Sequence, residues 1–149
     1  EEMHRAGVDV FDRNYQPVGN CTPPKFKVAW GDEYARRCQS LLETCLGKVP
    51  SCAYAVAVNT DGYLSAHNLK FSKPLTGDQA ADLVGNRTCR KFENPGELRA
   101  AKNTLPVLVR TYIRDTGELL CDIALPIHVA GRHWGNVRVG AVSEALLAE

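Results

Sequence analysis

Residues 110–142 read RTYIRDTGELLCDIALPIHVAGRHWGNVRVGAV, and this stretch decides the fold. Two turn-forming segments, 115–118 (DTGE) and 130–132 (AGR), divide it into three parts. The middle part carries an alternating apolar row: Leu119, Cys121, Ile123, Leu125, Ile127 and Val129. The same alternation continues on either side, in 107–113 and 137–141. A period of two predicts a three-stranded antiparallel meander, and we expect the row from Leu119 to Val129 to be buried.

The opposite face of the same strands mixes aromatic and charged side chains, among them Tyr112, Asp122 and Arg138. Periodicity leaves open whether this face lines a pocket. It also leaves two readings of Asp122 and Arg138, which either pair with each other or contact a ligand.

Composition is that of an ordinary globular chain. The 149 residues are 44% apolar and 23% charged, with a net charge of +1. We therefore expect a single domain, 1–149, and no nucleic-acid partner. Residues 1–31 would form a helix end and a loop lead-in, and residues 32–149 the core.

The six cysteines are an even number, which allows three disulfides. However, Cys38 and Cys45 have helical spacing on an apolar face, and Cys121 belongs to the apolar row of a strand. Buried free cysteine behaves as a small hydrophobic residue, so we expect reduced thiols at these three positions. No C-x-x-C-H motif occurs, which gives no support to a covalently bound c-type haem.

Residues 32–46 change to a period of 3.6 and predict an amphipathic helix, with Asp32 as N-cap and Gly47 as the stop. Residues 54–58 and 63–67 predict a hairpin through the turn 59–62. Short helices are expected at 78–84, 87–92 and 97–102. Helix, two strands, short helices and three strands indicate an α+β fold with an antiparallel sheet, in the element order of a PAS domain.

Several segments resemble one family of sensor domains. They are NTDGYLSAHN (59–68), NRTCRKF (86–92), RAAKNT (99–104), TYIRDTG (111–117) and PIHVAGRHWG (126–135). The chain resembles, over nearly its whole length, the PAS-like (Cache/PAS-type) sensor domain of bacterial methyl-accepting chemotaxis proteins. It departs from that pattern at Ser65, where the family usually has Pro, and at Leu105, where an acidic residue is common.

The resemblance implies a five-stranded antiparallel sheet, an N-terminal amphipathic helix, and short helices between strands two and three. It implies a non-enzymatic domain that binds a small molecule and passes a conformational change to an attached signalling helix, in a receptor that is a homodimer at full length. We expect a cytoplasmic sensor region, and a periplasmic position stays open.

The short helices between the two groups of strands, residues 78–103, form an excursion from the sheet. Arg87, Arg90 and Lys91 cluster in this excursion. The cluster predicts an anionic ligand, because an arginine can hold a carboxylate through two parallel hydrogen bonds. In a PAS-like fold this excursion lies over the sheet. The expected ligand-binding residues are His67, Asn68, Arg87, Arg90, Lys91, Tyr112, Asp122 and Arg138. No metal ligands, no catalytic residues and no cofactor are expected.

Two other classes of function compete with this one. The alternative sensor is a b-type haem or thiol-based redox or gas sensor that uses His67, His128 or His133 with the cysteines. An enzyme is disfavoured, because the chain has no G-x-S-x-G, H-E-x-x-H or Walker motif.

Overall fold

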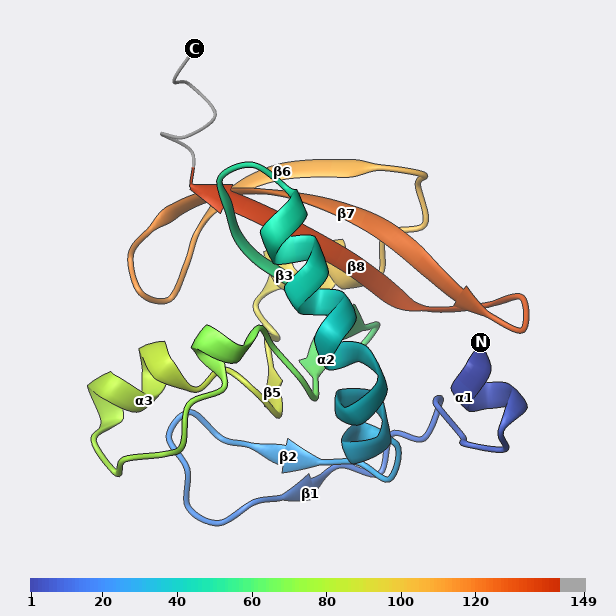
Figure 1. Ribbon diagram of the computed structural model, residues 1–149, viewed down its shortest axis with the longest axis horizontal. Coiled ribbons are helices and arrows are strands. Elements are labelled where there is room, and N and C mark those ends of the chain that lie inside the picture. Colours follow the sequence, from blue (N-terminus) through green and yellow to red (C-terminus); the bar gives the residue numbers. More distant parts are fainter. Residues whose placement is uncertain (143–149) are drawn as a thin grey trace.

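The computed structural model describes residues 1–142 and has an α+β architecture (Figure 1). Its main sheet has four antiparallel strands in the order β3-β8-β7-β6. These strands are β3 (Cys52–Asn59), β6 (Leu108–Ile113), β7 (Leu119–Val129) and β8 (Arg132–Val142). Two two-stranded sheets pair β1 (Gln16–Pro17) with β2 (Phe26–Lys27) and β4 (Tyr63–Leu64) with β5 (Arg90–Lys91). The helices are α1 (Glu2–Arg5), α2 (Gly31–Lys48), the 3₁₀ turn η1 (Leu69–Phe71), α3 (Gln79–Gly85) and α4 (Pro95–Ala101).

The C-terminal meander is confirmed, because β7 pairs with β6 on one side and with β8 on the other, antiparallel in both cases. The expected turns connect these strands. Gly117 and Gly131 take positive φ angles of 89° and 76°, which glycine adopts without steric cost. Turn chemistry and alternation together were sufficient to place these three strands.

The expectation of five strands in one sheet was wrong, because β4 does not join β3. Instead Tyr63 pairs with Lys91 in β5. The side-chain oxygen of Asn59 accepts the backbone N–H groups of Asp61 and Tyr63, at 3.0 and 3.1 Å. The N–H of Tyr63 is thus used inside the turn, and the chain leaves the sheet toward β5.

The excursion between β4 and β6 differs from the prediction in one of its three helices. The helices expected at 78–84 and 97–102 are present as α3 and α4, capped by the side chains of Asp78 and Asn94. The helix expected at 87–92 is wrong, because this segment is extended and contains β5. The backbone N–H of Arg87 bonds to the carbonyl of Phe71, which fixes the start of this segment beside η1.

The amphipathic helix is longer than predicted at both ends. It begins at Gly31, so Asp32 lies in its first turn and is not the N-cap, and it continues through Gly47 to Lys48. The helix lies in front of the sheet in Figure 1 and packs against β3. It covers one edge of the sheet and leaves the other edge bare.

Burial of the apolar row in β7 was predicted, and this prediction was wrong for most of the row. Leu119, Ile123 and Leu125 are 50%, 47% and 41% exposed. The residues that alternate with them, Leu120 and Asp122, have no exposed surface. The excursion, which includes α4, covers the mixed face, whereas α2 covers only the β3 side of the apolar face. Ile123→Ala should therefore cost less in the isolated chain than the 2–5 kcal/mol typical of a buried site.

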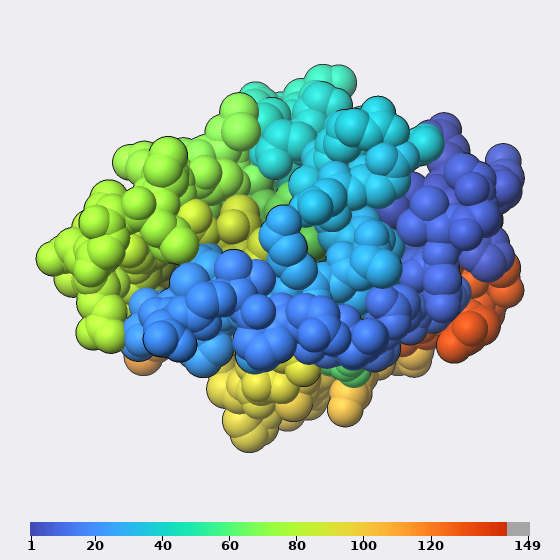
Figure 2. All heavy atoms as spheres, turned by 90° about the horizontal axis from the view of Figure 1, so that it is seen from below, coloured from blue at the N-terminus to red at the C-terminus, as the bar shows by residue number. Residues whose placement is uncertain are grey.

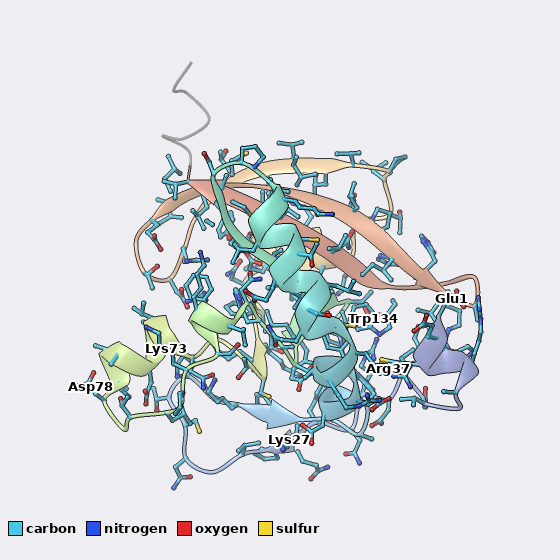
Figure 3. The ribbon with its side chains drawn as sticks, viewed as in Figure 1. Glu1, Lys27, Arg37, Lys73, Asp78 and Trp134 are labelled. Carbon is cyan, nitrogen blue, oxygen red and sulfur yellow. The ribbon has the colours of Figure 1, made fainter. Side chains whose placement is uncertain are left out.

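An aromatic cluster joins the N-terminal segment to the sheet. Trp30 packs edge-on against Trp134, with ring centroids 5.6 Å apart, and both belong to one core cluster with Tyr34 and Leu42 of α2. Trp134 is labelled beside α2 in Figure 3. The indole N–H of Trp134 donates to the carbonyl of Val10, and that of Trp30 donates to the carbonyl of Asp12. The N-terminal segment, coloured blue, runs along the lower surface of the molecule (Figure 2).

All six cysteines are free thiols, and each is partly buried. Among the residues that the structure describes, no helix has both the length and the apolar character needed to cross a bilayer.

Candidate functional site

A cavity of about 70 Å³ lies between the mixed face of the sheet and the segment 87–97. Strand β3 contributes three lining residues, Tyr54, Val56 and Val58. The remaining lining residues are Leu64, His67, Arg87, Phe92, Asn94, Glu97, Tyr112, Ile113, Arg114, Asp115 and Arg138. The mixed face therefore lines a pocket, a point that periodicity alone left open.

One row of residues across all four strands builds the floor of the site. Tyr54 in β3 lies opposite Gly140 in β8, which lies opposite Asp122 in β7, which lies opposite Arg110 in β6. The hydroxyl of Tyr54 donates to Asp122 Oδ2 at 2.7 Å and lies 2.8 Å from the hydroxyl of Tyr112. Since the Tyr54 hydrogen points to Asp122, the Tyr112 hydroxyl donates to the Tyr54 oxygen.

Two carboxylates hold the arginines of β6 and β8. Arg110 donates from Nε to Asp122 Oδ1 at 2.8 Å and from Nη2 to Asp122 Oδ2 at 2.9 Å, a two-pronged ion pair. Its Nη2 also donates to Glu97 Oε1 at 2.8 Å. Arg138 donates from Nη1 to Glu97 Oε2 and from Nη2 to the Glu97 carbonyl. Glu97, at the first turn of α4, therefore ties the excursion to the sheet.

On the other side of the cavity, Asp115 holds the two arginines of the excursion. Arg87 Nη1 lies 2.8 Å from Asp115 Oδ1, and Arg90 Nη2 lies 2.9 Å from Asp115 Oδ2. Both guanidinium groups lie over the ring of Phe92, at 5.3 and 4.5 Å from its centroid. Burial raises the pKa of Asp115, but the hydrogen bonds and positive charge of Arg87 and Arg90 outweigh burial and leave this pKa below its ordinary value.

The fifth arginine, Arg114, is less firmly held. Its guanidinium lies over the rings of Tyr54 and Phe71, 5.3 and 5.1 Å from their centroids. Its ion pair with Glu118 has a distance of 3.2 Å, and the Glu118 side chain is 50% exposed. A half-exposed carboxylate compensates a buried cation poorly, because water screens it.

Cations exceed anions around this cavity. The carboxylates paired with its five arginines are Glu97, Asp115, Glu118 and Asp122. Five positive charges against four negative charges leave an excess of one. Buried nitrogens also lack hydrogen-bond partners within the described residues, namely Nε of Arg138 and both Nε and Nη1 of Arg90. Unpaired buried donors of this kind favour an additional acceptor.

His67 lines the same cavity as an uncharged group. Its Nδ1 accepts the backbone N–H of Asn68 at 2.8 Å, so the ring proton of the neutral form lies on Nε2. Burial lowers the pKa of His67 well below its ordinary value, and the positive charges of Arg87 and Arg114 lower it further. This histidine therefore adds no positive charge at neutral pH and presents an N–H donor.

The eight residues predicted to bind a ligand fall into three groups. His67, Arg87, Tyr112 and Arg138 line the cavity. Arg90 and Asp122 lie directly behind the lining residues. Arg90 pairs with the lining residue Asp115. Asp122 accepts from the lining residue Tyr54 and pairs with Arg110.

The other two predicted residues lie elsewhere. Asn68 is a structural residue, because its side chain accepts the N–H of Ala55 and donates to the carbonyl of Leu42. Lys91 points away from the cavity and places its ammonium 4.1 Å from the ring centroid of Tyr15. Pairing of Asp122 with Arg138 was one of two open readings, and it does not occur, because each has a different partner.

Several residues of the site were not predicted from the sequence. Arg110, Tyr112 and Arg114 are spaced two residues apart along β6 and just beyond its end. The alternation in the sequence therefore already placed both arginines on the same face as Tyr112. Tyr54 was placed in a strand without a role, Asp115 in a turn and Glu97 in a helix. Their convergence depends on the register of β6 against β7 and on the docking of α4, which local patterns do not contain.

The histidines of the alternative haem or redox reading are not brought together. His128 and His133 face each other near the β7–β8 turn, with ring centroids 5.4 Å apart, whereas His67 lines the cavity. Within residues 1–142, no group of three or more His, Cys, Asp or Glu side chains is placed to hold a metal ion. Comparisons of the chain with protein-family models, with curated proteins and with solved structures found no match.

Proposed function

We propose that this chain is a PAS-like sensory domain that binds a small carboxylate in the cavity and passes a conformational change to an attached signalling helix. One observation carries the proposal, namely the excess of buried guanidinium groups around a cavity. The side chains of Arg87, Arg114 and Arg138 line it and are only 6%, 7% and 4% exposed. Burying cations without full compensation is costly, and an anionic ligand offsets that cost.

The size and walls of the cavity define the ligand further. A volume of about 70 Å³ holds about five water molecules, which suits a carboxylate with a very short carbon chain. The guanidinium groups offer donors for the carboxylate, and Val56, Leu64 and Phe92 offer an apolar wall for a methyl group. Acetate, propionate and pyruvate are ligands of this size and charge.

Asp115 gives the proposal a physical switch. Its carboxylate already occupies the position that a ligand carboxylate would take between Arg87 and Arg90, and its side chain is 32% exposed. A ligand that replaces Asp115 on Arg87 would release the turn between β6 and β7, in which Asp115 lies. The difference between the two arrangements is the differential contact that any ligand-driven shift requires.

A thermal-shift screen tests the binding. At matched ionic strength, acetate, propionate or pyruvate should raise the melting temperature, because a ligand that binds only the native state stabilises it. Acetamide and propionamide have the same shape without the charge and should have no effect. Asp115→Asn should increase the shift by weakening the internal competitor, whereas Glu93→Gln, which changes an exposed carboxylate outside the cavity, should leave it unchanged. Equal effects of acids and amides would contradict the proposal.

A further inference from the structure

The face of the main sheet that packs against α2 is apolar across three strands. Apart from Arg132 beside the β7–β8 turn, whose guanidinium lies over the ring of Phe11, the residues of β6, β7 and β8 in this face carry no charged side chain within the described part of the chain. The uncharged residues of this face are Val109, Thr111, Ile113, Leu119, Cys121, Ile123, Leu125, Ile127, Val129, Val137, Val139 and Ala141. An antiparallel sheet that faces water normally alternates polar residues outward, so this face has the composition of a covered one.

Exposure rises steadily along one row of this face. Ala55, Val139, Ile123 and Val109 lie opposite one another in β3, β8, β7 and β6. Ala55 is completely buried, Val139 is partly buried, and Ile123 and Val109 are 47% and 61% exposed. Helix α2 therefore covers the β3 edge, and the cover ends between β8 and β7.

One flank of α2 continues the exposed apolar surface of β6 and β7. Leu41 on this flank is 62% exposed and lines, with Ile127 and Val137, a largely apolar groove of about 420 Å³ between the helix and the sheet. The lining of this groove also includes Glu1, Glu2 and Arg37. Leu41, Leu125 and Ile123 thus form one connected surface with Val109 at the edge strand. We call this surface the bare face.

We propose that the bare face is a homodimer interface, in which the β6–β7 half of the sheet packs on the same half of a second copy of this chain. Two sheets packed face to face lie about 10 Å apart, and a helix is about 10 Å across. A second sheet laid on β6 and β7 would therefore reach the height of α2 and abut its flank at Leu41. A second sheet has about the thickness of α2, so it would cover the part of the sheet that α2 leaves exposed.

Charge and area favour a second copy over another partner. A two-fold axis brings a surface against itself, and the β6–β7 half of this face, which has no charged side chain among the described residues, meets its copy without like-charge contacts. Homodimer interfaces are also the more apolar class. With strands about 4.8 Å apart and 3.3 Å per residue, β6, β7 and the flank of α2 measure on the order of 20 by 30 Å. That is about 600 Å² per partner, at the lower end of the roughly 600–1,000 Å² per partner of specific, stable interfaces.

Analytical ultracentrifugation of the 149-residue chain tests this interface, over concentrations from about 1 µM to about 1 mM. The wild type should reach twice the chain mass of 16.4 kDa. Ile123→Glu should be a folded monomer, because its side chain is already half exposed in the single chain. Leu41→Glu should weaken the dimer at least tenfold. Val84→Glu is the matched control, because Val84 is 52% exposed on α3, outside the bare face.

A wild type that stays monomeric over the whole range would overturn the proposal and leave the face to a different partner. A dimer that tolerates Ile123→Glu as well as it tolerates Val84→Glu would also overturn it. Persistence of the full dimer in Leu41→Glu would contradict the packing against α2. Circular dichroism of each variant separates loss of the dimer from loss of the fold.

Discussion

Tyr54 and Asp122 lie on strands that are not neighbours, yet the hydroxyl of Tyr54 donates to the Asp122 carboxylate at 2.7 Å. The bond crosses β8 at Gly140, which has no side chain to obstruct the ring. A Cβ atom at Gly140 would lie 2.3 Å from Tyr54 Cε1. This contact joins three strands under the cavity and holds the acceptor on which Arg110 is fixed.

Removal of the Tyr54 hydroxyl should weaken the fold. Tyr54→Phe takes a donor away from the buried Asp122 carboxylate, which typically costs about 1–3 kcal/mol. Tyr112→Phe is the matched control, since among residues 1–142 the Tyr112 hydroxyl bonds to Tyr54 and not to the carboxylate. Urea unfolding of the two variants should show the larger loss for Tyr54→Phe, and the reverse order would contradict the hydrogen-bond directions given above.

Gly140→Ala should disturb the same row by steric means. The new methyl group would meet the rigid Tyr54 ring, and overpacking of this kind costs about 1–3 kcal/mol. Gly47→Ala is a suitable control, because within residues 1–142 no atom beyond its own stretch of helix lies within 4 Å of a Cβ at that position. Gly47→Ala should be neutral or stabilising in thermal unfolding. A stable Gly140→Ala protein with an unshifted Tyr54 ring would show that the row has more room than the structure gives it.

Glu97 should be the most costly charge to remove. Its carboxylate holds Arg110 and Arg138, and its side chain is 10% exposed. Glu97→Gln keeps the shape but leaves two buried guanidinium groups with less compensation, and breaking a buried pair costs about 3–5 kcal/mol. Glu33→Gln removes a carboxylate that bonds Arg36 and Arg37 on the exposed side of α2 and should cost much less. Chemical denaturation of both variants provides the measurement, and similar losses would be inconsistent with this assignment.

His67 should give the domain a pH-dependent stability. Burial, aided by Arg87 and Arg114, holds the pKa of His67 well below its ordinary value. Below about pH 6.5 the unfolded chain binds a proton that the folded chain does not, so stability falls as the pH falls. The slope should approach about 1.4 kcal/mol per pH unit until the folded-state pKa is reached.

His67→Gln should flatten this slope between pH 6.5 and 5 in denaturation experiments, because it removes the titrating group. His4→Gln, at an exposed position of α1, is the control and should keep the wild-type slope. A carboxylate bound beside His67 should reduce the slope as well, because a nearby negative charge favours the protonated ring. An unchanged slope in His67→Gln would mean that other groups cause the acid sensitivity.

The sequence was sufficient for elements whose signals are local. Alternation and turn residues placed β6, β7 and β8, and short helices were expected at 78–84 and 97–102, close to the observed α3 and α4. Local patterns did not determine which of the two faces of the sheet is buried. Ile123 has an apolar side chain and is half exposed, whereas Asp122 is charged and fully buried, because ion pairs with Arg110 compensate it.

The candidate site was predictable only in part for the same reason. Arg87 could be identified as a member of a cationic cluster and Arg138 from its place on the mixed face, and both line the cavity. Their counter-charges could not be identified, since Asp115 and Glu97 approach them across long sequence separations. Lys91 shows the limit of clustering, because it is next to Arg90 in sequence and points to the other side of the strand, toward Tyr15.

Isothermal titration calorimetry with acetate, propionate and pyruvate tests the central claim most directly. Wild type should bind at least one of them, and Arg87→Ala should bind it about tenfold to more than a hundredfold more weakly, since a charge-assisted bond contributes roughly 1.5–3 kcal/mol. Arg36→Ala, at an exposed arginine of α2, should bind like wild type. Absence of binding by all three acids, or equal affinities of wild type and a folded Arg87→Ala protein, would contradict a carboxylate site in this cavity.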